Sequence, residues 1–92
     1  MDNSRARIVV SGEVQGVGYR SFALAHGRAL SLGGYVRNAF DGTVELEVEG
    51  DRSTIEGLVE HLRQGPRAAR VIDVDVQWTD FTGEFDGFEV RF

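Results

Sequence analysis

The clearest structural signal lies in the middle of the chain, where the sequence runs Asp41-Gly42-Thr43-Val44-Glu45-Leu46-Glu47-Val48-Glu49. Apolar and acidic residues alternate over residues 44–49, which is typical of a strand with one buried face and one exposed face. The Asp-Gly pair before it is a strong signal for a tight hairpin turn. Residues 35–38 are therefore predicted to form the strand on the other side of that turn.

Two segments with helical periodicity flank this hairpin. The first is predicted over residues 19–30, where the apolar residues gather on one side. This side consists of Tyr19, Phe22, Ala23, Ala25, Ala29 and Leu30. Gly27 is expected to weaken the helix by about 1 kcal/mol relative to alanine. The second helix is predicted to begin at a capping box of Ser53 and Glu56 and to end at Gly65-Pro66. Its apolar positions are Ile55, Leu58, Val59 and Leu62.

Three further strands are expected around these elements. Residues 6–11 form a β-branched run closed by Gly12, and residues 88–92 form a short strand at the end of the sequence. A strand over residues 71–78 is expected to turn one set of side chains inward, namely Ile72, Val74, Val76 and Trp78. The order β-α-β-β-α-β plus a terminal strand predicts a single α+β domain over residues 1–92. Its architecture is a ferredoxin-like two-layer sandwich, with two helices on one face of an antiparallel sheet.

The composition excludes several kinds of chemistry. The chain has no cysteine, which rules out disulfides, thiolate nucleophiles and thiolate metal sites. All ten basic residues are arginine, so neither a Schiff-base lysine nor a Walker lysine is available. The two histidines, His26 and His61, argue against a His-rich metal site. No apolar run approaches a membrane span, and no signal peptide is evident, so a soluble, cytoplasmic monomer is expected.

The charge pattern bears on nucleic-acid binding. The net charge of −5 disfavours binding to a phosphate backbone or an anionic membrane. The strand alternation predicts an acidic, solvent-exposed face opposite the helices, carrying Glu45, Glu47, Glu49, Asp73 and Asp75. RNA-binding modules of similar topology use aromatic and basic residues on this face. An RNA-binding function is therefore disfavoured.

Two places are candidates for a functional site. Between the first strand and the first helix, Gly16 and Gly18 permit a backbone whose N–H groups turn inward around an anion, beside the positive end of the helix dipole. Arg20 adds a permanent charge and a planar donor fork. At the end of the second strand, the Asn38 amide can hold a water in a fixed orientation. The same residues also have structural explanations. The glycines and Arg20 are equally typical of an ordinary turn with a surface arginine, and Asn38 is equally typical of a residue that only shapes the hairpin. Composition alone favours these structural explanations.

Longer motifs around these residues resemble the signatures of the acylphosphatase family. The first match is Gly12-Glu13-Val14-Gln15-Gly16-Val17-Gly18-Tyr19-Arg20, and the second is Gly34-Tyr35-Val36-Arg37-Asn38 followed by Asp41-Gly42-Thr43-Val44. The resemblance spans roughly residues 7–92. Gly27 and Ser31 depart from the family pattern at positions for helix packing and capping, which affects local stability rather than chemistry.

The resemblance implies an enzyme that hydrolyses acyl phosphates to a carboxylate and inorganic phosphate, without a metal or other cofactor. Arg20 and Asn38 would be catalytic: Arg20 would bind the phosphate and Asn38 would orient the attacking water. The Thr43 hydroxyl would support Asn38. Arg37 alternates with Val36 along its strand, so it is expected to be a solvated side chain outside the site. The phosphate-binding loop would present the backbone N–H groups of Gln15, Gly16, Val17, Gly18, Tyr19 and Arg20.

The mechanism implied needs no histidine. The substrate is an activated anhydride, and phosphate becomes a good leaving group once its charge is neutralised, so positioning and electrostatic stabilisation would suffice. A substrate phosphate oxygen could take the water's proton. A non-catalytic anion-binding or regulatory module of the same fold is the alternative, and the carbamoyl-phosphate-handling domain of larger maturation proteins has a similar signature. The chain carries no specific motif for the acyl group, which suggests broad acceptance.

Overall fold

In the computed structural model, which describes residues 2–92, the central hairpin has the predicted form. β2 (Gly33–Asn38) pairs antiparallel with β3 (Val44–Asp51). The apolar residues of β3 turn inward and are fully buried, namely Val44, Leu46 and Val48. The hairpin thus supplies both a wall of the core and the turn next to Asn38.

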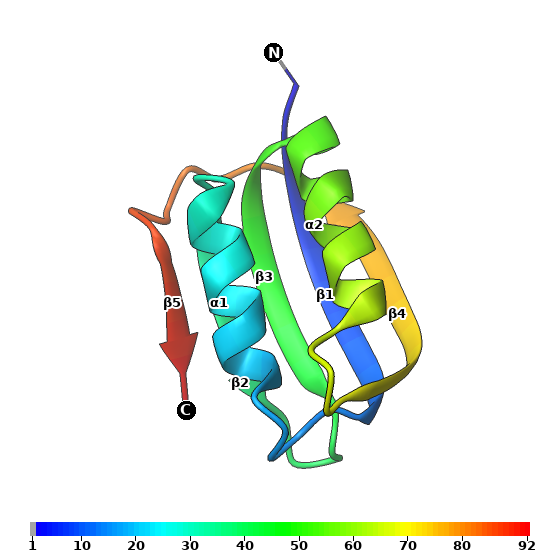
Figure 1. Cartoon of the computed structure of the whole chain (residues 1–92). Helices are drawn as coiled ribbons and strands as arrows, with labels where there is room; N and C mark the ends of the chain where they lie inside the picture. Colours follow the sequence, from blue (N-terminus) through cyan, green and yellow to red (C-terminus); the bar gives the residue numbers. More distant parts are fainter. Residues whose placement is uncertain (1) are drawn as a thin grey trace.

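Three more strands complete the sheet, which has the order β4-β1-β3-β2-β5 over the described residues (Figure 1). They are β1 (Asn3–Glu13), β4 (Arg70–Thr79) and β5 (Phe88–Arg91). The predicted ferredoxin-like sandwich is confirmed, but the sheet is mixed because β5 runs parallel to β2. The prediction of a wholly antiparallel sheet is therefore wrong for the last strand. β4 ends where β2 begins, and residues 80–87 cross to the far edge at that end of the sheet, so β5 must run in the direction of β2.

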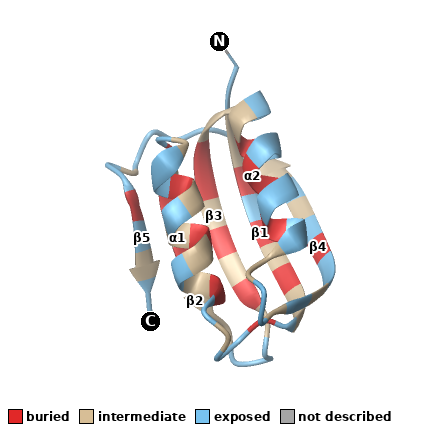
Figure 2. Cartoon of the chain, in the orientation of Figure 1, coloured by how far each residue is buried: buried red, intermediate tan, exposed pale blue. Residues whose placement is uncertain are grey.

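Both helices cover the same face of the sheet (Figure 1). α2 (Arg52–Gln64) buries the four predicted residues Ile55, Leu58, Val59 and Leu62. Figure 2 shows further buried residues on the strands that the two helices cover. The predicted capping box is wrong. Because β3 leads directly into α2, Asp51 takes the N-cap position, and Ser53 lies inside the helix with its hydroxyl donating to Asp51 Oδ2 at 2.5 Å.

α1 (Tyr19–Ala29) turns a narrower side inward than predicted. Tyr19, Ala23 and Gly27 are buried, whereas Ala25 and Ala29 are exposed. Gly27 has a packing role: a Cβ atom there would lie 2.8 Å from Cδ2 and Cγ of the Phe88 ring. The glycine therefore lowers helix propensity but lets β5 approach the helix closely.

A β-bulge changes which residues of β4 face the core. Ser11 lies opposite Asp73 and Gly12 opposite Val71, so Ile72 is the extra residue between them. Ile72 is exposed, which overturns its predicted inward direction, while Val71 packs against the core. Gly12 makes the bulge possible, because it has a φ of 126° and a Cβ there would meet the carbonyl oxygen of Arg70 at 2.1 Å.

The face opposite the helices is less open than expected. Asp73 and Asp75 are exposed as predicted, but the glutamates of β3 are mostly covered, with side-chain exposures of 16% for Glu45, 14% for Glu47 and 4% for Glu49. Arginines on neighbouring strands cover them with their side chains and neutralise their charge, in the pairs Arg5–Glu47, Arg5–Glu49, Arg7–Glu45 and Arg37–Glu45. The acidic surface predicted for β3 is therefore wrong.

Glu49 is also held by the segment that crosses to β5. Its carboxylate accepts hydrogen bonds from the backbone N–H of Thr82 at 2.6 Å and of Gly83 at 3.1 Å. Burial opposes its ionisation, but these hydrogen bonds and the charge of Arg5 outweigh burial, so the pKa of Glu49 lies below its usual value. This carboxylate anchors the connection that delivers β5 to the edge.

Candidate functional site

The loop between β1 and α1 has a backbone that only glycine adopts easily. Gly16 and Gly18 have φ angles of 73° and 80°, in the left-handed region. A Cβ atom at either position would meet nothing within 4 Å, so backbone conformation rather than lack of space explains these glycines. Gly18 is the N-cap of α1, and the loop therefore leads straight into the positive end of the helix.

The loop, the first turn of α1 and the end of β2 enclose a small cavity of about 90 Å³. It is lined by Val14, Gly16, Gly18, Tyr19, Arg20, Ser21 and Asn38. The bond from the Phe22 N–H to the Gly18 carbonyl opens the helix, so the N–H groups of the residues between them have no intrahelical acceptor. The cavity thus combines free backbone donors with a helix N-terminus, which favours an anion.

Arg20 supplies the charge at this cavity. Its side chain is half-buried, and its guanidinium carbon lies 5.1 Å from the centroid of the Phe92 ring. It forms no ion pair with any residue in the described part of the chain. Its positive charge is consequently available to a ligand.

Asn38 reaches the same cavity from the last position of β2, where it pairs with Val44. Its side-chain oxygen Oδ1 is buried and has no hydrogen-bond partner among residues 2–92. An unpaired buried carbonyl costs about 1–3 kcal/mol, and such groups are uncommon in folded proteins except where function uses them. The two predicted catalytic side chains, Arg20 and Asn38, are therefore brought to one cavity.

Gln15 joins the loop to the hairpin turn. Its Nε2 donates to the carbonyl oxygens of Ala39 at 2.8 Å and Thr43 at 2.9 Å. These carbonyls flank the turn that follows Asn38, so the side chain of Gln15 sets the distance between the loop and Asn38. Gln15 and Val17 do not line the cavity, unlike Gly16, Gly18, Tyr19 and Arg20 of the predicted loop.

Thr43 acts differently from the prediction. Its hydroxyl donates to Asp41 Oδ1 at 2.6 Å and not to Asn38. Side-chain and backbone hydrogen bonds from Thr43 hold the pKa of Asp41 below its usual value. The hydroxyl of Thr43 is thus used inside the turn, and the carbonyl of Thr43 contacts the loop by accepting from Gln15.

The side chain of Tyr19 has a structural role. It is buried, burial raises its pKa, and its hydroxyl donates to the carbonyl of Leu62 at 2.6 Å in the last turn of α2. The hydroxyl of Tyr19 is therefore used to join α1 to α2. Sequence reasoning missed Ser21, which also lines the cavity; its place in the first helical turn, next to Arg20, is the signal that could have found it.

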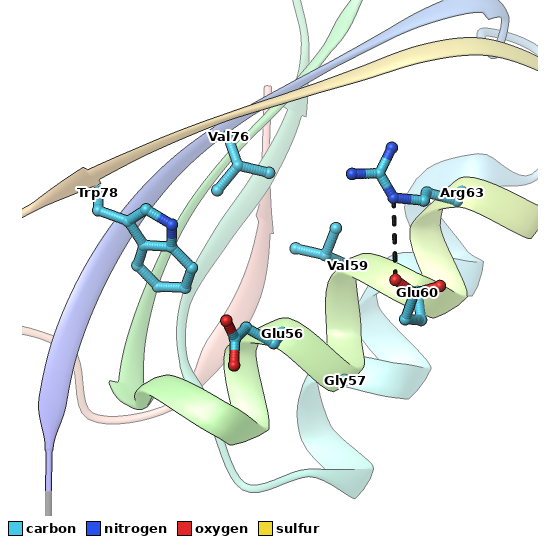
Figure 3. A pocket seen from close by; sticks show the side chains of 7 residues that line it. All are labelled: Glu56, Gly57, Val59, Glu60, Arg63, Val76 and Trp78. Atoms are coloured by element: carbon cyan, nitrogen blue, oxygen red, sulfur yellow. Dashed lines mark ion pairs between the residues drawn. The ribbon is translucent and has the colours of Figure 1, made fainter.

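A larger hollow, of about 520 Å³, lies between α2 and β4 (Figure 3). It is lined by Glu56, Gly57, Val59, Glu60, Arg63, Val76 and Trp78. Its charged groups are well exposed, and Arg63 pairs with Glu60 at 4.0 Å. No residue of either sequence motif lines it, and its charged side chains are exposed to solvent, so size alone does not make it a catalytic site.

Neither histidine approaches the small cavity. His26 and His61 instead stack on each other between the two helices, with ring centroids 4.0 Å apart. Burial and the neighbouring His61 lower the pKa of His26. No group of three or more potential metal-ligating side chains occurs within residues 2–92.

Comparisons with known proteins agree with the sequence motifs. A family model described as Acylphosphatase matches residues 6–90. A protein named acylphosphatase from Anaeromyxobacter dehalogenans (strain 2CP-C) is 53% identical over 91 residues, covering 99% of this chain and 98% of its own length. Another, from Pelotomaculum thermopropionicum (strain DSM 13744 / JCM 10971 / SI), is 51% identical over 92 residues and 100% of both chains.

A solved structure is similar over the same length. The crystal structure of acylphosphatase from Bacillus subtilis has a TM-score of 0.93 and 31% identity, covering 97% of this chain and 99% of that one. Over the part of the chain that the structure describes, neither helix is long and apolar enough to span a membrane.

Proposed function

Because the chain belongs to the acylphosphatase family, we propose that it hydrolyses acyl phosphates in the small cavity between the glycine loop and Asn38. One observation carries the assignment of the site. The guanidinium of Arg20 and the Oδ1 of Asn38, neither of which has an ion-pair or hydrogen-bond partner among residues 2–92, line the same cavity of about 90 Å³, beside two left-handed glycines. A cation, free N–H donors and a buried acceptor are what a phosphate and an attacking water require.

The phosphate binds first. Arg20 donates to its oxygens, and the backbone N–H groups of Gly16, Gly18 and the first turn of α1 complete the contacts. These donors are fixed before the substrate arrives, so they stabilise the charge of the transition state without reorganisation. The phosphate dianion needs these local donors, because the net charge of the chain, −5, repels an anion overall.

Asn38 then positions the water. A water that donates a hydrogen bond to the buried Oδ1 of Asn38 is held beside the phosphate bound at Arg20, because both side chains line the same cavity. This arrangement directs attack to phosphorus, with the carboxylate as leaving group, rather than to the acyl carbon. The new bond joins the water oxygen to phosphorus, the bond from phosphorus to the bridging oxygen breaks, and both water protons finish on phosphate. The acyl phosphate dianion and water thus give a carboxylate anion and H₂PO₄⁻.

Hydrolysis in ¹⁸O-labelled water tests this proposal. We expect the purified chain to hydrolyse acetyl phosphate in the presence of EDTA, and the label to appear in inorganic phosphate. Label in acetate would refute attack at phosphorus. Binding of phosphate without any turnover would instead support the non-catalytic anion-binding module. A monomeric state, a cytoplasmic location and the lack of nucleic-acid binding stay predictions from the sequence.

A further inference from the structure

A second hollow adjoins the phosphate cavity. It has a volume of about 350 Å³ and is lined by Arg37, Asn38, Ala39, Phe40 and Phe92. Asn38 lines both hollows. Arg20, in the wall of the first, lies 5.1 Å from the ring of Phe92, in the wall of the second. The two hollows are therefore neighbours, and the second is within reach of a group attached to a phosphate at Arg20.

Two exposed phenyl rings line this second hollow. Phe40 is 110% exposed and Phe92 is 98% exposed, although the chain buries other aromatic residues such as Phe88 and Tyr19 almost completely. A single exposed phenyl ring needs no explanation, but two that line one hollow beside a candidate active site indicate a ligand surface. One ring comes from the β2–β3 turn and the other from the residue that follows β5, so no single sequence motif contains both.

The charge at this hollow is already balanced. Arg37 is the charged residue in its lining, and its Nε and a terminal nitrogen both donate to Glu45 Oε1, at 3.1 and 3.0 Å. The guanidinium therefore offers little to a second anionic group on the substrate. The apolar rings and the neutralised arginine together favour an acyl group that is uncharged and apolar.

We propose that the hollow between Phe40 and Phe92 binds the acyl group of the substrate, and that the chain prefers acyl phosphates with an aromatic or bulky aliphatic acyl group. The proposal rests on the phosphate site described above, because it uses that site to fix the other end of the substrate. It narrows the broad acceptance expected from the sequence. Acetyl phosphate, whose methyl group covers little of either ring, is then a poor substrate.

The test compares benzoyl phosphate with acetyl phosphate in the wild type and in Phe40→Ala, Phe92→Ala and Phe81→Ala. Phe81 is another exposed phenylalanine, but it belongs to the connection between β4 and β5. That connection crosses the sheet at the end opposite to the loop between β1 and α1 (Figure 1). We expect the ratio of kcat/KM for benzoyl phosphate to that for acetyl phosphate to fall about three- to tenfold in Phe40→Ala and Phe92→Ala, because apolar contact area is lost. Phe81→Ala should leave the ratio unchanged.

The two anhydrides differ in intrinsic reactivity, but this difference is the same for every variant. Comparing the ratio between variants therefore cancels it. The loss should appear mainly as a raised KM for benzoyl phosphate, since the apolar contact exists in the ground state and the transition state alike. Inhibition by inorganic phosphate should stay the same in Phe40→Ala, because Phe40 does not line the phosphate cavity. Phe40 is fully exposed, so its removal should not prevent folding, and circular dichroism checks this.

An unchanged ratio in both phenylalanine variants would overturn the proposal while leaving acylphosphatase activity in place. So would an equal loss for both substrates in Phe40→Ala. If the wild type hydrolyses neither compound, the proposed function fails, and the acyl site fails with it. The two failures are thus distinguished by the wild-type rates alone.

Discussion

Replacing Gln15 by alanine tests whether the loop and the β2–β3 turn act as one unit. The side chain donates hydrogen bonds to the carbonyls of Ala39 and Thr43, at 2.8 and 2.9 Å, and Asn38 is the residue just before that turn. Without these bonds the loop and the turn are no longer joined at this point. The water held by Asn38 then shifts relative to the phosphate held by Arg20.

The size of the effect follows from the geometry. Each carbonyl keeps one backbone donor, because Gly42 N–H bonds to Ala39 and Ala39 N–H bonds to Thr43, and Gln15 is exposed to water. At about 1 kcal/mol for each bond, the free energy of unfolding should fall by about 1–2 kcal/mol. A displacement of about 1 Å at reacting groups costs up to about a hundredfold in rate, so kcat should fall at least tenfold.

The assay combines urea denaturation with kcat for acetyl phosphate and inhibition by inorganic phosphate. Gln15→Glu keeps the shape of the side chain but replaces its two donors with acceptors, so it should lose at least as much activity as Gln15→Ala. Gln77→Ala, which changes an exposed glutamine of β4, is the control. If Gln15→Ala is less stable but keeps full kcat, the contact is structural and the coupling of loop to turn is refuted.

Other consequences of the structure can be measured in the same way. Arg20→Ala should lose at least about 3 kcal/mol of transition-state stabilisation together with inhibition by phosphate, whereas Asn38→Ala should lower kcat and keep that inhibition. Equal loss of phosphate affinity in both variants would contradict the separate roles. Gly27→Ala should lower the free energy of unfolding by about 1 kcal/mol in urea titrations, because crowding against Phe88 outweighs the gain in helix propensity; a stabilised variant would show that the ring moves aside. The pKa of His26 is lower in the folded chain than in the unfolded one, so stability should fall as pH drops below about 6.5. Urea titrations at pH 7.5 and 5.5 should show this loss in the wild type and a smaller one in His26→Gln, and equal losses would rule His26 out as the cause.

The elements that depend on local patterns could be predicted from the sequence. The bounds of β3 follow from its alternation to within a few residues, and those of α2 follow from its helical spacing and from Gly65-Pro66 at its end. The two motifs also identified Arg20 and Asn38, and the structure brings both to one cavity. Each of these signals lies within one short stretch of chain.

The features that the sequence could not predict come from contacts between distant segments. The direction of β5 depends on the end of the sheet at which residues 80–87 cross, and no local pattern encodes this. The exposure of Ile72 depends on a bulge in the pairing with β1, and the burial of Glu49 depends on Thr82 and Arg5. For the same reason the contact of Gln15 with the turn was missed. The hydrogen-bond acceptors of a loop glutamine are known only once the fold has brought the loop and the hairpin together.

The position of β5 has a consequence for enzyme handling. This strand has four residues, pairs with β2 alone and leads into Phe92, whose ring lies against Arg20. Terminal segments of a fold can open at a lower free energy than global unfolding. Fraying of β5 would free the guanidinium to sample other rotamers while the helices and the remaining strands stay folded. A preparation with an unchanged far-ultraviolet spectrum can therefore already have lost turnover, and activity rather than secondary structure is the sensitive measure of its integrity.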